Sequence, residues 1–93
     1  MNNNGHYSHD EVAGRINQFV VNELLYDVEN TTIDNGTKLI EQGIVDSMGI
    51  FRLIAFLEEA FGVEIEPDAV VLENFETINA VATLITNTKP AHI

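Results

Sequence analysis

The stretch Gly43-Ile44-Val45-Asp46-Ser47-Met48 marks the point where a long irregular segment gives way to a helix. Apolar residues then recur at helical spacing, at Ile50, Leu53, Ile54, Leu57 and Phe61. Gly62 follows, and glycine is typical of the position just after a helix. The sequence therefore predicts a helix from Ser47 to about Phe61. Its start would hold the Ser47 hydroxyl in water, where free N–H groups and the helix dipole favour an added anionic group.

Two further long helices are predicted on either side of this one. Ser8 and Glu11 have the spacing of a capping box, and the apolar residues Val12, Ile16, Phe19, Val20 and Leu24 extend a helix from about His9 to Tyr26. Thr77 suits the N-cap of a final helix, with inward residues Ile78, Val81, Ala82, Leu84 and Ile85. Between residues 68 and 75 we expect one brief helix, and residues 63–66 are interpreted as extended loop.

The connection from Val28 to Asp46 is long for a small domain. Four apolar residues can dock it on the core, namely Ile33, Leu39, Ile40 and Ile44. The expected fold is all-α: a small four-helix bundle of three main helices and one short helix, with a long loop between the first two. We expect a single domain over residues 1–93, with flexible ends at residues 1–7 and 88–93.

Composition excludes several classes of function. The 93 residues include 4 Lys and Arg against 15 Asp and Glu, a formal net charge of −11. This charge argues against binding nucleic acid or anionic membranes, and favours partners with basic patches. Cysteine is absent, which excludes disulfides and thiolate chemistry. No secretion signal or membrane-length apolar run is evident, so we expect a cytoplasmic protein.

Ser47 could in principle be a catalytic nucleophile, but it lacks the necessary companions. Such a serine needs a general base and an orienting group. The histidines are His6, His9 and His92, all near the ends of the chain and without metal-ligand spacing. The Gly-x-Ser-x-Gly elbow is also absent. We therefore expect neither an enzyme nor a metal site.

The segment Asp46-Ser47-Met48 resembles the modification site of acyl carrier and peptidyl carrier proteins. The surrounding chain matches the pattern of this family at residues 39–44, 57–63 and 74–78, and the resemblance runs from about Glu11 to Ile85. It implies that Ser47 carries phosphopantetheine from coenzyme A, and that the thiol of this arm holds an acyl or aminoacyl group as a thioester.

The resemblance also implies partners. Asp46 would contact the phosphopantetheinyl transferase, in addition to its dipole-compensating role as N-cap. An acyl or aminoacyl ligase would load the cargo, and a downstream transferase or synthase would receive it. The carrier itself would be a monomer without catalysis.

The predicted helix after Ser47 shows a second apolar face formed by Met48, Phe51 and Ala55. Two interpretations are open: these residues belong to the core, or they form a partner-facing stripe, since exposed Met and aromatic residues are common recognition devices. Glu58 and Glu59 would extend such a stripe as an acidic rim, or are simply solvated charges.

Two positions depart from the pattern of fatty-acid carriers, which usually have acidic residues two and five positions after the serine. This chain has Gly49 and Arg52 there. The resemblance therefore points to a specialised carrier with dedicated partners. One alternative is an unmodified carrier-like docking module, which is distinguished from a carrier by whether Ser47 accepts the arm. A second alternative is a small acidic partner or inhibitor protein, which stable stoichiometric binding independent of Ser47 would favour.

Overall fold

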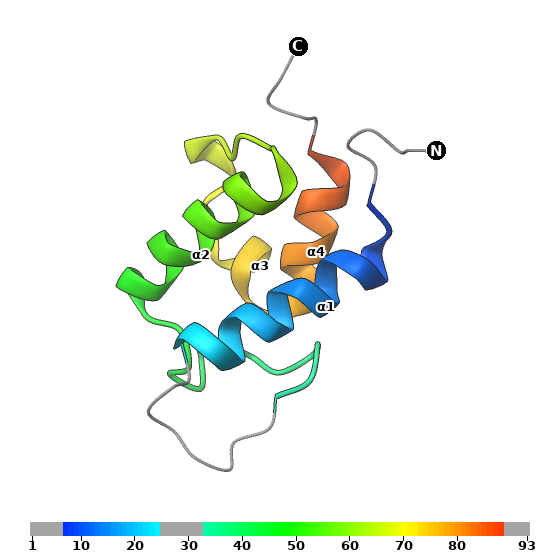
Figure 1. Cartoon of the computed structure of the whole chain (residues 1–93). Coiled ribbons are helices and arrows are strands. Elements are labelled where there is room, and N and C mark those ends of the chain that lie inside the picture. Colours follow the sequence, from blue (N-terminus) through cyan, green and yellow to red (C-terminus); the bar gives the residue numbers. More distant parts are fainter. Residues whose placement is uncertain (1–6, 25–32, 89–93) are drawn as a thin grey trace.

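The helices pack around a shared core in the computed structural model, which describes residues 7–24 and 33–88 (Figure 1). Helix α1 spans His9–Phe19 and continues as a π-helical segment, η1, over Val20–Leu24. Helix α2 spans Ser47–Phe61, and a 3₁₀ turn, η2, covers Pro67–Ala69. Short helix α3, Leu72–Phe75, precedes α4, Ile78–Asn87.

This arrangement confirms the expected all-α bundle of three main helices and one short helix. Helices α1 and α4 lie side by side, and α3 lies between α2 and α4 (Figure 1). In residues 63–66 the structure has an extended loop, as predicted, and the described part of the chain contains no strand. Helix α3 lies within residues 68–75, where one brief helix was expected, and η2 forms a separate turn that starts at Pro67. No helix within the described ranges is long and apolar enough to cross a membrane.

The ends of α1 behave differently. At its start, the Ser8 hydroxyl oxygen accepts a hydrogen bond from the Glu11 N–H at 3.1 Å, which confirms the predicted cap. At its end, the helix widens into η1 at Val20 instead of continuing as regular α-helix. Val20 is buried and Glu23 is exposed. The predicted end at Tyr26 lies outside the described residues.

The inward face of α2 supplies the centre of the core. Leu53 and Leu57 are fully buried and Phe61 nearly so, whereas Ile50 and Ile54 are half-buried. The buried residues from α1 and α4 that complete this cluster include Val12, Ile16, Ile78, Val81 and Ile85. Burial of apolar surface of this kind is the main source of stability in a small domain.

The loop that leads to α2 docks on the core, as its apolar residues predicted. Leu39 is fully buried, and its N–H donates to the Glu76 carbonyl at 2.9 Å. The Leu39 carbonyl in turn accepts from the N–H groups of Ile44 and Val45, at 2.9 and 3.1 Å. Gly43 permits this tight return because its φ of 74° is readily available only to glycine. The loop therefore delivers the chain to α2 along a defined path.

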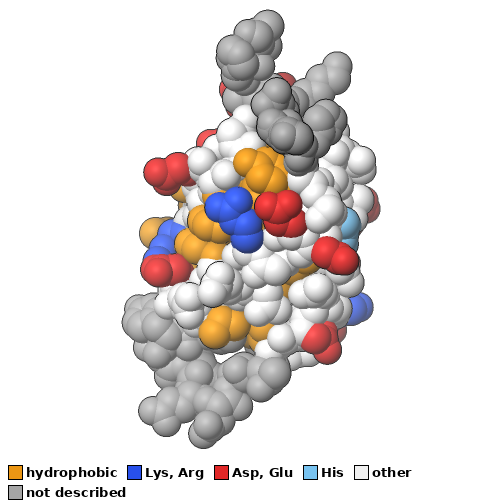
Figure 2. All heavy atoms as spheres, turned by 45° about the vertical axis from the view of Figure 1, so that its right-hand side comes forward, with side chains coloured by type: hydrophobic (Ala, Val, Ile, Leu, Met, Phe, Trp, Pro, Cys, Tyr) orange, Lys and Arg blue, Asp and Glu red, His pale blue; other side chains and the backbone are white. Residues whose placement is uncertain are grey.

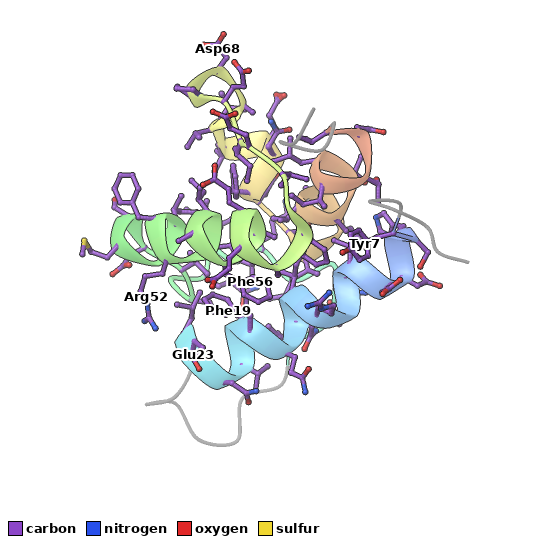
Figure 3. All side chains as sticks on the ribbon, turned by 45° about the horizontal axis from the view of Figure 1, so that its top comes forward. Tyr7, Phe19, Glu23, Arg52, Phe56 and Asp68 are labelled. Atoms are coloured by element: carbon purple, nitrogen blue, oxygen red, sulfur yellow. The ribbon has the colours of Figure 1, made fainter. Side chains whose placement is uncertain are left out.

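Both boundary residues of the expected flexible ends make defined contacts. The ring of Tyr7 packs edge-on against Phe61, with centroids 5.0 Å apart (Figure 3). The Thr88 hydroxyl donates to the Leu84 carbonyl at 2.6 Å. The packed structure thus extends to these two residues, while residues 1–6 and 89–93 lie outside the described part of the chain.

Candidate functional site

Ser47 is exposed and is the first residue of the 15-residue helix α2. The helix start is capped by its neighbour: Asp46 Oδ1 accepts the Gly49 N–H at 2.9 Å, and the Asp46 carbonyl accepts the Ile50 N–H at 2.9 Å. The predicted N-cap role of Asp46 is confirmed. Because Asp46 supplies the cap, the Ser47 hydroxyl is not needed for it and can serve as an attachment point.

The local electrostatics suit an anionic group on Ser47. The first N–H groups of a helix have no intrahelical acceptor. Asp46 satisfies the N–H groups of Gly49 and Ile50, which leaves those of Ser47 and Met48 as the first-turn donors that the helix and its cap do not use. Together with the helix dipole, these donors favour a phosphate bonded to the serine. The residues present therefore fit a phosphopantetheine arm at this position.

The second apolar face of α2 is exposed, which rules out the interpretation that these residues belong to the core. The exposed fraction is 68% for Met48 and 66% for Phe51, and Ala55 is also exposed. These residues contribute little to the core. They form an apolar stripe, which we call the Met48–Phe51–Ala55 stripe, on the helix that begins with Ser47.

Arg52 lies beside this stripe and reaches back to the end of η1. Its Nη2 atom is 3.4 Å from Glu23 Oε1, and its Nη1 donates to the Glu23 carbonyl at 3.3 Å (Figure 3). Both side chains are about half exposed, so the pair contributes little net stability. Its effect is on charge, because Glu23 balances the only cation of α2.

The two glutamates at the end of α2 differ in their surroundings. Glu58 is half-buried, and its Oε2 accepts the Ile65 N–H at 3.0 Å, which ties α2 to the loop that follows it. Glu59 is exposed. Of the expected acidic rim, Glu59 thus presents its carboxylate to solvent, whereas Glu58 has a structural partner.

Aromatic contacts along the seam between α1 and α2 were not anticipated from the sequence. Phe19 stacks on Phe56 with ring centroids 4.4 Å apart, and Phe56 lies edge-on to Phe61 (Figure 3). The Arg15 guanidinium lies 4.8 Å from the Phe61 ring centroid. Figure 2 shows hydrophobic side chains at the surface beside a cationic side chain. These side chains form a contact between α1 and α2, the helix that begins with Ser47.

Other kinds of site find no support in the described residues. Among them, no group of three or more His, Cys, Asp or Glu side chains could hold a metal ion. His9 contacts the Asn79 carbonyl and the Thr83 hydroxyl, both at 3.3 Å and both on α4. The nearest candidate base in the sequence is therefore engaged between α1 and α4 rather than with Ser47.

Comparisons with known proteins agree with this geometry. A family model described as "PP-binding: Phosphopantetheine attachment site" matches residues 20–85. A solved structure titled "Structure of KstB-PCP(apo)", a peptidyl carrier protein, is similar with a TM-score of 0.60 and 32% sequence identity, covering 91% of this chain and 96% of that chain. No curated protein matches the chain significantly.

Proposed function

Because the chain belongs to the phosphopantetheine attachment-site family, we propose that Ser47 is the residue that carries the arm. The protein is a carrier that holds thioester intermediates on phosphopantetheine. The observation that supports Ser47 is its exposed position at the head of α2, where Asp46 supplies the helix cap. We further propose that residues 1–93 form one carrier domain.

In the attachment step this chain provides the attacking hydroxyl group. The Ser47 hydroxyl oxygen forms a bond to the pantetheine-bearing phosphorus of coenzyme A, and the bond from that phosphorus to the bridging oxygen of the pyrophosphate breaks. Adenosine 3′,5′-bisphosphate leaves with the electron pair, and a base of the transferase takes the serine proton. The N–H groups at the helix start stabilise the new phosphodiester. When bound, the arm supplies a terminal thiol on which an acyl or aminoacyl group is held.

The chemistry beyond attachment belongs to partner enzymes. Family members in general do not catalyse reactions themselves, and they interact with phosphopantetheinyl transferases and biosynthetic enzymes. For this chain we propose that an acyl or aminoacyl ligase loads the thiol and that a downstream transferase or synthase accepts the cargo. The chain supplies the surface that partners recognise and the arm that carries the cargo to them, and its partners supply the reactive groups.

We expect the protein from its native host to carry the arm. Its intact mass should exceed that of the unmodified chain by one phosphopantetheinyl group, or by that group plus the cargo. Proteolysis followed by mass spectrometry should place the added mass on the peptide that contains Ser47. If the native protein has only the mass of the bare chain, the alternative of an unmodified docking module is favoured instead.

We propose that partners recognise the Met48–Phe51–Ala55 stripe. Its large side chains are exposed and border the attachment residue, and apolar contact of this kind gives an interface its residence time. Arg52 and Glu59 would set charge specificity at the edges of the stripe, while Asp46 would meet the transferase next to Ser47. The Glu58 carboxylate would contribute mainly through its contact with Ile65.

Long-range attraction would come from an acidic segment that begins at the end of α2. From residue 58 to residue 76 the chain has no Lys or Arg and contains the carboxylates Glu58, Glu59, Glu64, Glu66, Asp68, Glu73 and Glu76. A partner with a basic patch would be steered towards this segment. The acidic segment would thus speed the encounter with a partner, and the apolar stripe would lengthen the lifetime of the complex.

The variant Phe51→Ala tests the recognition stripe. Because Phe51 is 66% exposed, its removal should change the free energy of unfolding by no more than about 0.5 kcal/mol. The second-order rate constant for loading by a transferase should nevertheless fall by about tenfold, as expected for loss of an aromatic interface anchor worth about 1.4 kcal/mol. A loading assay quenched at a series of times gives the rate constant, and a melting curve gives the change in stability.

Val21→Ala is the matched control, because Val21 is an exposed apolar residue of η1, away from Ser47 in the sequence. It should leave both the rate constant and the melting temperature nearly unchanged. Equal loading rates for Phe51→Ala and Val21→Ala would show that the stripe is not used by the transferase.

A further inference from the structure

Gly49 lies in the first turn of α2 and is buried. A Cβ atom at this position would lie 3.0 Å from Val45 Cγ1 and 3.4 Å from Asp46 Oδ1. Carbon atoms pack favourably at roughly 3.5–4.0 Å, so a methyl group would force one of these neighbours to move. The bare backbone of Gly49 is therefore the surface on which residues 45 and 46 close over the helix start.

Neither neighbour can yield without cost. Val45 is only 2% exposed, and its N–H donates to the Leu39 carbonyl. Two hydrogen bonds hold Asp46: its Oδ1 accepts from the Gly49 N–H, and its carbonyl accepts from the Ile50 N–H. Ser47 lies between Asp46 and Gly49 in the chain and is exposed. A displacement of Val45 or Asp46 would therefore move the Ser47 side chain more easily than it would move the buried core.

We infer that Gly49 is a positioning residue for Ser47, a conclusion that rests on Ser47 being the attachment site. The missing side chain lets Val45 and Asp46 pack against the first turn of α2 and so sets the direction of the Ser47 hydroxyl. This explains one departure from the fatty-acid carrier pattern. The crowding of a Cβ atom by Val45 and Asp46 gives a packing reason for glycine at position 49, independent of the charge of the interface.

The substitution Gly49→Ala tests this inference, with coenzyme A, Mg²⁺ and a broad-specificity phosphopantetheinyl transferase as the probe. We expect the loading kcat/KM to fall about tenfold, since small misplacement of a reacting group is costly. The loss should lie mainly in kcat, because the exposed Met48–Phe51–Ala55 stripe that sets KM is unchanged. A purely structural role would lower the melting temperature without this kinetic signature in the folded protein.

Gly14→Ala is the matched control. Gly14 is also within a helix, but a Cβ there would meet no heavy atom within 4 Å. It should keep the wild-type kcat and raise the melting temperature, since alanine is the better helix former.

The double variant Gly49→Ala with Val45→Ala provides the rescue, because it removes the Val45 Cγ1 atom that the new methyl would meet. It should load faster than Gly49→Ala alone. Should Gly49→Ala not fold at the assay temperature, the double variant is compared with Val45→Ala alone. Equal loading by these two variants supports the inference, and slower loading by the double variant overturns it.

The outcomes separate the inference from the proposal beneath it. Absence of loading on the wild-type chain would refute attachment at Ser47. Normal loading of wild type together with equal kcat values for Gly49→Ala and Gly14→Ala would overturn the positioning role alone. Loss of loading in Gly49→Ala that removal of the Val45 methyls does not relieve would also overturn it.

Discussion

Ser47→Ala should abolish phosphopantetheinylation while leaving the fold intact. Incubated with coenzyme A, Mg²⁺ and a transferase, the wild-type chain should gain the mass of one arm, and the variant should gain none because the attacking oxygen is gone. The free energy of unfolding should change by no more than about 0.5 kcal/mol, since Ser47 is exposed and Asp46 caps the helix. Intact-mass spectrometry and a denaturant titration measure the two effects.

Ser8→Ala gives the reciprocal control, because Ser8 and Ser47 are the two serines of the chain. Ser8 caps α1 through the Glu11 N–H, so its loss should cost roughly 1 kcal/mol of stability and leave loading unchanged. Mass added to Ser47→Ala would show that another residue is the acceptor. Failure of several transferases to modify the wild type would refute the proposed attachment.

Leu57→Ala should produce a large loss of stability. Leu57 is fully buried within the core cluster, and replacing a buried leucine by alanine costs about 2–5 kcal/mol in lost burial and cavity formation. The whole free energy of unfolding of a domain is typically only about 5–15 kcal/mol. The midpoint of urea unfolding should therefore fall substantially, with little change in the slope.

The same substitution at an exposed leucine supplies the comparison. Leu72 is 62% exposed on α3, so Leu72→Ala should shift the unfolding midpoint only slightly. If the two variants unfold at the same urea concentration, the inward face of α2 has been assigned to the wrong residues.

Local signals determined which helix ends could be predicted. Both ends of α2 follow from residues within one turn: Asp46 caps the first, and Gly62 closes the second with a φ of 64°. The π-helical end of α1 could not be foreseen in this way. Its Glu23 contacts Arg52, which is 29 positions away in sequence, and such a contact depends on how two helices pack.

The same distinction applies to the site. The exposed serine at the start of α2 and its Asp46 cap could be predicted because both belong to one short motif at a helix start. The exposure of Met48 and Phe51 remained open because a helix with apolar residues on two faces does not reveal which face is buried. Glu58 and Gly49 could be interpreted only with the structure, since their contacts with Ile65 and Val45 depend on the paths of the loops that flank α2.

The turn at Gly43 shows that space for a side chain and freedom of the backbone are separate conditions when a residue is replaced. A side chain at this position would meet nothing within 4 Å, yet the backbone φ of 74° would strain any residue with a Cβ atom. Glu41 and Gln42 are also exposed, and the Gln42 N–H donates to the Lys38 carbonyl at 3.0 Å. A library that seeks carriers with altered partners can therefore vary the side chains at 41 and 42, with proline left out at 42 because it has no N–H to donate. It should retain glycine at 43, or test asparagine there, because an empty surface is no guide to tolerance when the constraint lies in the main chain.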